Sequence, residues 1–129
     1  MEKGAKCILK GLAYCDQGKF DEAIEEFTKV IEEFSKTIDL DLLALAYGKR
    51  GWAYSGKGEY DKAIADYDKA IELDPEFAVA YSSRGWVYLK KDEDEYDKAI
   101  ADLEKCIEVS RDPALILEVQ EMLDELRDD

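Results

Sequence analysis

The chain has 129 residues, the length of one domain, and its 47% hydrophobic content is typical of a globular protein, which excludes wholesale disorder. Asp and Glu total 32 against 18 Lys and Arg, a net charge of −14, so nucleic acid and anionic membranes are excluded as partners. The absence of histidine removes the usual general base and the commonest metal ligand.

Targeting signals are also absent from the sequence. The start of the chain, residues 1–4, lacks a signal-peptide core, and the longest apolar run, Leu42 to Tyr47, is six residues, too short to span a bilayer. Three cysteines without CxxC spacing indicate reduced thiols. We therefore expect a cytoplasmic protein.

Three segments of similar sequence follow one another along the chain. They read GLAYCDQGKFDEAIEEFTKVI from Gly11, GWAYSGKGEYDKAIADYDKAI from Gly51 and GWVYLKKDEDEYDKAIADLEKCI from Gly85. The second interval is 34 residues, whereas the first is 40 because of surplus residues at about 36–43. The third copy carries two extra residues in the 91–95 loop. A fixed period with insertions at the junctions predicts a stacked array of repeats.

Each copy has the pattern of a helical hairpin. In the second copy, Tyr47, Gly51 and Tyr54 recur at spacings of four and three, which places them on one helix face. The glycines within 56–58 end this helix, and Asp74–Pro75 ends the next one, because the residue before a proline avoids the helical region. No stretch shows the period-two alternation of a strand, so the sequence predicts an all-α fold.

These residues resemble the tetratricopeptide repeat (TPR) family, whose 34-residue hairpin carries Gly-x-x-Tyr, then Ala-x-x-x-Phe/Tyr, then Pro. The second copy has the full pattern: Gly51, Tyr54, Ala63, Tyr67 and Pro75. The other copies match at Gly11, Tyr14, Ala23 and Phe27, and at Gly85, Tyr88, Ala99 and Leu103, with Ser35 in place of the first proline and Pro113 two residues late.

The resemblance implies a right-handed superhelix of three helix-turn-helix repeats in a single domain, residues 1–129. Repeat 1 covers about 4–37, repeat 2 about 44–77 and repeat 3 about 78–113. A C-terminal helix at about 113–127 is expected to cap the array, with Asp112 as its N-cap, which makes seven helices.

A charge pattern accompanies the repeats. The residue before each repeat glycine is basic, and the residue before each ring or leucine of the second helix is acidic. We expect these residues to form structural ion pairs within or between repeats. The three pairs in register are Lys10 with Glu26, Arg50 with Asp66 and Arg84 with Asp102.

In TPR proteins the first helices of successive hairpins line a concave groove that binds a peptide segment. The resemblance places the residue after each glycine in that groove, together with its neighbours at spacings of three and four. Those positions are Ala5, Ile8, Leu12 and Cys15 in the first copy, Leu45, Gly48, Trp52 and Ser55 in the second, and Val79, Ser82, Trp86 and Leu89 in the third.

Both tryptophans of the chain occupy the position after the glycine. Tryptophan is enriched in binding hot spots, so we predict that Trp52 and Trp86 anchor a ligand. The open alternative is that their rings pack within the protein, on each other, on neighbouring leucines or under the C-terminal helix. The remaining predicted site residues are Leu12, Leu45, Val79 and Leu89 as flanking apolar contacts, and Ile8, Ser55 and Ser82 as secondary contacts.

One TPR subclass, the chaperone adaptors, binds a C-terminal carboxylate with a clamp of Lys, Asn and Arg side chains. The clamp positions correspond here to Ile8, Leu12, Lys49, Val79 and Ser83. None of these five residues matches the family pattern, and four of them cannot supply a cation. We therefore do not expect carboxylate-tail binding of that kind.

Catalytic and metal chemistry is not indicated. Cys7, Cys15 and Cys106 have no histidine or neighbouring cysteine to complete a metal or redox site. The acidic loop at 91–95 lacks the alternating ligands and glycine of a calcium loop. We expect no enzyme activity, no metal and no cofactor.

The sequence therefore predicts a protein-interaction module with an apolar and aromatic groove. The expected partner is a hydrophobic or amphipathic protein segment, neutral to basic because the domain is acidic. The alternative is a self-associating or structural TPR fragment whose groove is filled by its own chain or by a second copy. We expect a monomer or a weak homodimer.

Overall fold

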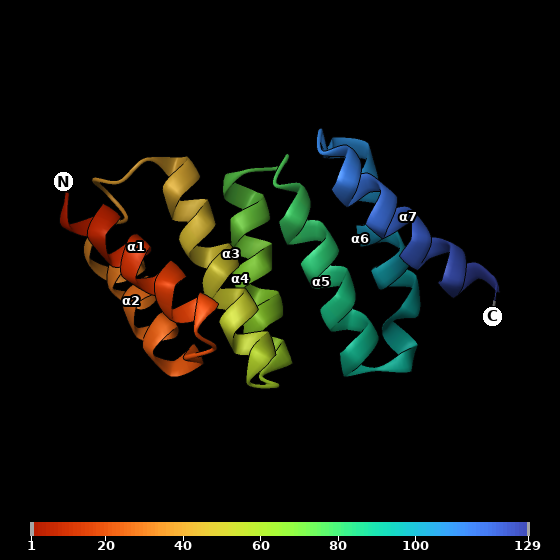
Figure 1. Ribbon diagram of the computed structural model, residues 1–129, viewed down its shortest axis with the longest axis horizontal. Coiled ribbons are helices and arrows are strands. Elements are labelled where there is room, and N and C mark those ends of the chain that lie inside the picture. The colour runs from red at the N-terminus through yellow and green to blue at the C-terminus, as the bar shows by residue number, and fades with distance from the viewer. Residues whose placement is uncertain (1, 129) are drawn as a thin grey trace. The chain divides into compact units, whose positions relative to one another are not determined.

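The structure is a computed structural model that describes residues 2–128. Within that range it contains seven α-helices and one short 3-10 helix, and no strand (Figure 1), which confirms the all-α prediction. None of the described helices is both long and apolar enough to cross a membrane. The elements are α1 (Lys3–Asp16), α2 (Phe20–Glu33), α3 (Leu40–Gly56), α4 (Tyr60–Leu73), α5 (Ala78–Lys91), η1 (Glu93–Glu95), α6 (Tyr96–Val109) and α7 (Pro113–Asp128).

The helices group into two compact units, residues 1–75 and 76–129. In the first unit α1 packs against α2 and α3, and α3 packs against α2 and α4. In the second unit α6 packs against both α5 and α7. The predicted hairpins are thus present as α1–α2, α3–α4 and α5–α6, visible as neighbouring antiparallel ribbons in Figure 1. That all of residues 1–129 form one domain stays a prediction.

The two helices of the first hairpin approach most closely at Gly11. A methyl group at this position would lie 2.6 Å from two carbons of the Phe27 ring, well inside van der Waals contact. The ring cannot move aside, because Phe27 is completely buried together with Ala23. The repeat glycine is therefore required by packing.

A Schellman motif turns the chain after α1. The Lys19 amide donates to the Tyr14 carbonyl at 2.9 Å and the Gly18 amide donates to the Cys15 carbonyl at 3.0 Å. Gly18 has a φ of +72°, a conformation that glycine adopts without a steric cost. The turn after α3 repeats this arrangement with Gly58 at a φ of +78°. The third hairpin has no glycine here, and its longer connection contains the three-residue η1 instead.

The predicted start of the C-terminal helix is confirmed. α7 begins at Pro113, and the Asp112 carboxylate accepts a hydrogen bond from the Ala114 amide at 3.0 Å. Val119 and Leu123 of its apolar stripe are buried against α6. One boundary differs from the expectation: α3 begins at Leu40, so part of the surplus at 36–43 lengthens this helix.

Candidate functional site

Trp52 lies on α3 with an exposed surface. Its side chain is 40% exposed, a large value for a tryptophan in a folded domain. The ring of Phe20, at the start of α2, packs edge-on against it with centroids 5.4 Å apart and an interplanar angle of 64°. Phe20 therefore holds one side of the Trp52 ring while the remaining surface is open. The sequence analysis did not identify Phe20.

The other predicted residues of the first unit have different environments. Leu12 and Leu45 are half-buried and pack against the core. The Ser55 hydroxyl donates to the Trp52 carbonyl at 2.7 Å, so it is engaged within its own helix. Ile8, predicted to face a ligand, is only 3% exposed and belongs to the core, which corrects its placement. It packs inward because α1 contacts both α2 and α3 and buries that part of its surface.

In the second unit, the predicted residues form one stripe on α5. Trp86 is 42% exposed and Val79 is 48% exposed, and Leu89 and Ser82 are half-buried. Their spacings of three and four keep all four on one helix face. The Ser82 hydroxyl donates to the Val79 carbonyl at 3.1 Å and is thus engaged within the helix.

A lysine accompanies the second tryptophan. The Lys90 ammonium lies 5.3 Å from the centroid of the Trp86 ring, within the range of a cation–π contact. The sequence analysis did not identify this lysine, although its spacing of four from Trp86 on one helix is a signal for the contact. The tryptophan is therefore presented with a positive charge beside it.

In two of the hairpins, an ion pair connects the first helix to the second. Arg50 donates from Nε and Nη2 to the two carboxylate oxygens of Asp66, both at 2.8 Å, and from Nη1 to Thr28 of α2 at 3.1 Å. The guanidinium also lies 5.6 and 5.7 Å from the ring centroids of Tyr47 and Tyr54. The hydrogen bonds to the Asp66 carboxylate raise the pKa of Arg50 above its usual value. The pair therefore fixes the orientation of the α3 helix that carries Trp52.

The second unit has the same pair. Arg84 donates from Nε and Nη2 to the carboxylate of Asp102 at 2.8 and 2.7 Å. The predicted third pair does not form: Glu26 instead accepts from Lys29 at 3.2 Å, and its Oε1 atom is buried without a hydrogen-bond partner. A lysine lacks the planar fork that lets Arg50 and Arg84 bind both carboxylate oxygens, and Lys10 is exposed.

The three cysteines are free thiols, with Cys15 and Cys106 buried and Cys7 half-buried. Burial raises the pKa of all three, and the nearby Glu26 carboxylate adds to the effect at Cys7. Among residues 2–128, no three His, Cys, Asp or Glu side chains come together as a possible metal site.

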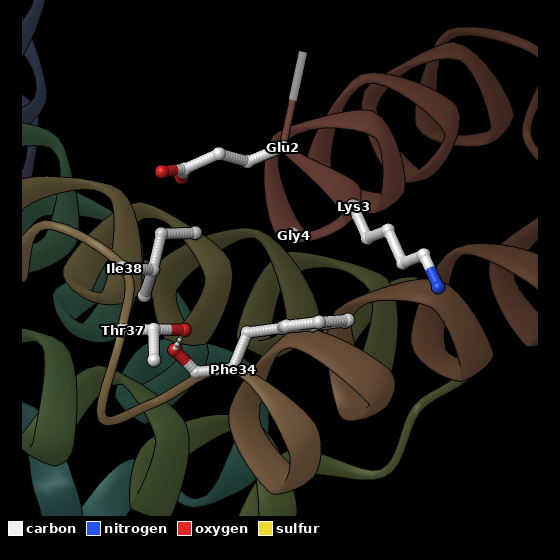
Figure 2. Close-up of a pocket in the computed structure, with 6 residues that line it drawn as sticks. All are labelled: Glu2, Lys3, Gly4, Phe34, Thr37 and Ile38. Atoms are coloured by element: carbon white, nitrogen blue, oxygen red, sulfur yellow. Dashed lines mark hydrogen bonds between the residues drawn. The ribbon is translucent and has the colours of Figure 1, made fainter.

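A pocket of about 260 Å³, lined by neither tryptophan, lies between the start of α1 and the α2–α3 connection (Figure 2). Phe34 and Ile38 form its apolar floor, and Gly4 leaves room between them. The Thr37 hydroxyl donates to the Phe34 carbonyl at 3.3 Å, shown dashed in Figure 2. The charged groups at its mouth, Glu2 and Lys3, are exposed, so no buried polar group points to a ligand.

Comparison with known proteins identifies the repeat. Three tetratricopeptide repeat profiles match residues 7–36, 44–77 and 66–101. Together they cover most of the three hairpins. No curated protein sequence matches the chain.

Several solved structures are similar over nearly the whole chain. The first TPR of Spaghetti (RPAP3), bound to the HSP90 peptide SRMEEVD, is 25% identical with a TM-score of 0.82, covering 98% of this chain and 91% of that one. The TPR2B domain of yeast Sti1 in its complex with pHsp70 is 23% identical with a TM-score of 0.83, and the match covers 98% of this chain and 97% of that chain. MamA is 26% identical with a TM-score of 0.72, and the match covers 98% of this chain and 77% of that chain.

Proposed function

Because this chain belongs to the tetratricopeptide repeat family, we propose that it is a non-enzymatic protein-interaction module that binds a partner segment through its exposed tryptophans. In this proposal Trp52 and Trp86 are the anchors, and Leu12, Leu45, Val79 and Leu89 supply the surrounding apolar contacts. Ser55 and Ser82 contribute small surfaces that let a partner approach the helices.

The observation that carries the proposal is the exposure of both tryptophans at the same position of two hairpins. Trp52 is 40% exposed and Trp86 is 42% exposed. A tryptophan contributes more to stability when buried, so two exposed ones at matched positions favour a binding role. Phe20 and Lys90 hold the rings from the side and reduce the entropy that binding would cost.

The proposed partner is a hydrophobic or amphipathic segment of a protein, neutral to basic in charge. Covering the rings and their apolar neighbours would supply the binding energy. The net charge of −14 favours encounter with neutral or basic segments over acidic ones.

This preference differs from that of the similar structures bound to the HSP90 peptide SRMEEVD, which ends in an acidic sequence. Of the positions that correspond to the carboxylate clamp, Ile8 is buried and Leu12, Val79 and Ser83 carry no charge. Only Lys49 supplies a cation, so we propose that this chain does not bind the acidic tail.

The test is an affinity capture from the source lysate with wild type and the Trp52→Ala/Trp86→Ala variant, followed by titration of a captured partner's segment. Tryptophan fluorescence in single-tryptophan variants (Trp52→Phe or Trp86→Phe) reports directly which ring is covered. We expect the double variant to lose at least about tenfold in affinity, because tryptophan hot spots contribute 2 kcal/mol or more.

The matched control is Leu40→Ala, a substitution of an exposed apolar residue on the same helix as Trp52 but off the stripe. It should leave binding unchanged, and circular dichroism should show all variants equally helical. Equal retention by wild type and the double variant would refute the tryptophan anchors. Binding of SRMEEVD at similar affinity would refute the proposed charge preference.

A further inference from the structure

The face of α1 that is turned away from α2 and α3 is exposed and basic. It consists of Lys6, Leu9, Lys10 and Ala13, spaced three and four apart on one side of the helix, and is called the α1 face below. Leu9 is 53% exposed at its centre. Within the described residues, neither lysine has an acidic group within ion-pair distance.

The face of α7 that is turned away from α6 has the same spacing with the opposite charge. It consists of Ala114, Leu117, Glu118 and Glu121, and is called the α7 face below. Leu117 is 62% exposed, the most exposed large hydrophobic side chain of residues 2–128. Neither glutamate is ion-paired in the described part of the chain.

Several other lysines lie beside acids on the same hairpin. Lys62, Lys69 and Lys105 each pair with a glutamate three residues away. On the α1 and α7 faces the lysines and the glutamates have instead been left without partners around an exposed leucine. Two such faces, one basic and one acidic, are complementary in charge.

The two faces match each other when their helices run in opposite directions. Lys6 then lies opposite Glu121, and Ala13 opposite Ala114, with the leucines meeting side by side in the middle. We propose that the α1 face of one molecule binds the α7 face of a second copy. This contact is heterologous, because the two molecules use different faces, and each molecule carries one face of each kind.

The large negative charge of the chain does not prevent this contact. At physiological ionic strength charges interact over about 8 Å, so the groups facing each other across the contact dominate over the net charge. The inference does not depend on the tryptophans and stands apart from the proposed function.

Sedimentation and light scattering of the purified protein at physiological salt test this contact. The average mass of wild type should rise with concentration above 14.7 kDa. Lys6→Glu/Lys10→Glu and Glu118→Lys/Glu121→Lys should each weaken self-association at least about tenfold, because each places like charges across the contact. An equimolar mixture of the two variants should associate again, since every contact between unlike molecules is once more complementary.

Matched controls make the same charge changes elsewhere on the exposed surface. Lys19→Glu/Lys36→Glu and Glu32→Lys/Glu33→Lys should associate like wild type. A wild type that stays monomeric up to about millimolar concentration overturns the proposal, and so does a mixture that fails to associate while both variants remain helical. Loss of association in Trp52→Ala/Trp86→Ala, with the charge variants unaffected, would also overturn it and would assign self-association to the tryptophans instead.

Discussion

Two side-chain differences in one ion pair separate the first hairpin from the other two. In the second and third hairpins an arginine binds both oxygens of a buried aspartate. In the first hairpin the basic residue is Lys10 and the acid is Glu26, one methylene longer. Glu26 turns to Lys29, and one of its oxygens stays buried without a partner. The Cys7 thiol lies beside this carboxylate but is only a weak donor. Since a poorly satisfied buried acceptor costs up to about 1–3 kcal/mol, we expect this ion pair to stabilise its hairpin less than the other two do.

Restoring the arginine–aspartate pair should therefore stabilise the protein. We expect Lys10→Arg/Glu26→Asp to add about 1 kcal/mol to the free energy of unfolding, because the fork of the arginine satisfies both carboxylate oxygens. Thermal unfolding followed by circular dichroism should show a rise in Tm of roughly 4 °C.

The reverse change is the matched control. Arg50→Lys/Asp66→Glu converts the second hairpin to the arrangement of the first and should lower the Tm, because the bonds to Thr28 and to both Asp66 oxygens are lost together. If the first variant is no more stable than wild type, the orphaned oxygen of Glu26 has no energetic consequence and the prediction is wrong.

At the scale of the helices, the ends are set by local chemistry. The glycines after α1 and α3 adopt positive φ and close Schellman motifs, and Pro113 with Asp112 opens α7. These signals are short-range, so the helix ends they govern could be predicted. α3 begins at Leu40 after Asp39, a preferred N-cap residue whose side chain makes no capping hydrogen bond here, and Leu43 in its first turn is buried in the core.

The cap of α7 provides a prediction at this scale. Asp112→Ala removes the acceptor for the Ala114 amide and should destabilise α7 by about 1 kcal/mol. Hydrogen exchange measured by mass spectrometry should show faster exchange in the first turns of α7. Asp112→Ser, which retains an acceptor, should stay close to wild type.

Asp92→Ala is the matched control, because Asp92 accepts from the Asp94 amide in the same way but caps only the three-residue η1. It should leave exchange in α7 unchanged. Equal exchange in α7 for Asp112→Ala and wild type would show that the helix is held by its packing on α6 alone.

At the scale of the whole molecule, each of the two units contains a buried thiol: Cys15 in residues 1–75 and Cys106 in residues 76–129. A thiol in such a position reacts only when its unit opens, and its labelling rate reports the free energy of that opening. The chain thus carries one reporter of local stability in each unit.

Near neutral pH we expect a disulfide reagent to label Cys7 slowly and to leave Cys15 and Cys106 unlabelled until denaturant is added. Burial raises the pKa of these thiols above their usual value of 9.0, so the folded state favours the protonated form. The burial of the protonated thiols therefore contributes fully to the stability of the folded state below pH 9.0. This contribution is lost as the pH rises through the higher pKa that the thiols have in the folded state. Single-cysteine variants assign each rate, and labelling of Cys15 or Cys106 as fast as in the unfolded chain would contradict their burial.

The helices, their pairing into hairpins and the turns between them could be predicted from the sequence, because repeat period, helical periodicity and turn residues are local properties. The sequence also predicted the arginine–aspartate pairs of the second and third hairpins from register alone. Which side chains of a stripe reach solvent was decided by the tertiary structure, because that depends on neighbours distant in sequence. The packing of α1 on two helices buries Ile8. The Phe20 ring of α2 contacts the Trp52 ring of α3. Glu26 pairs with Lys29 and not with Lys10.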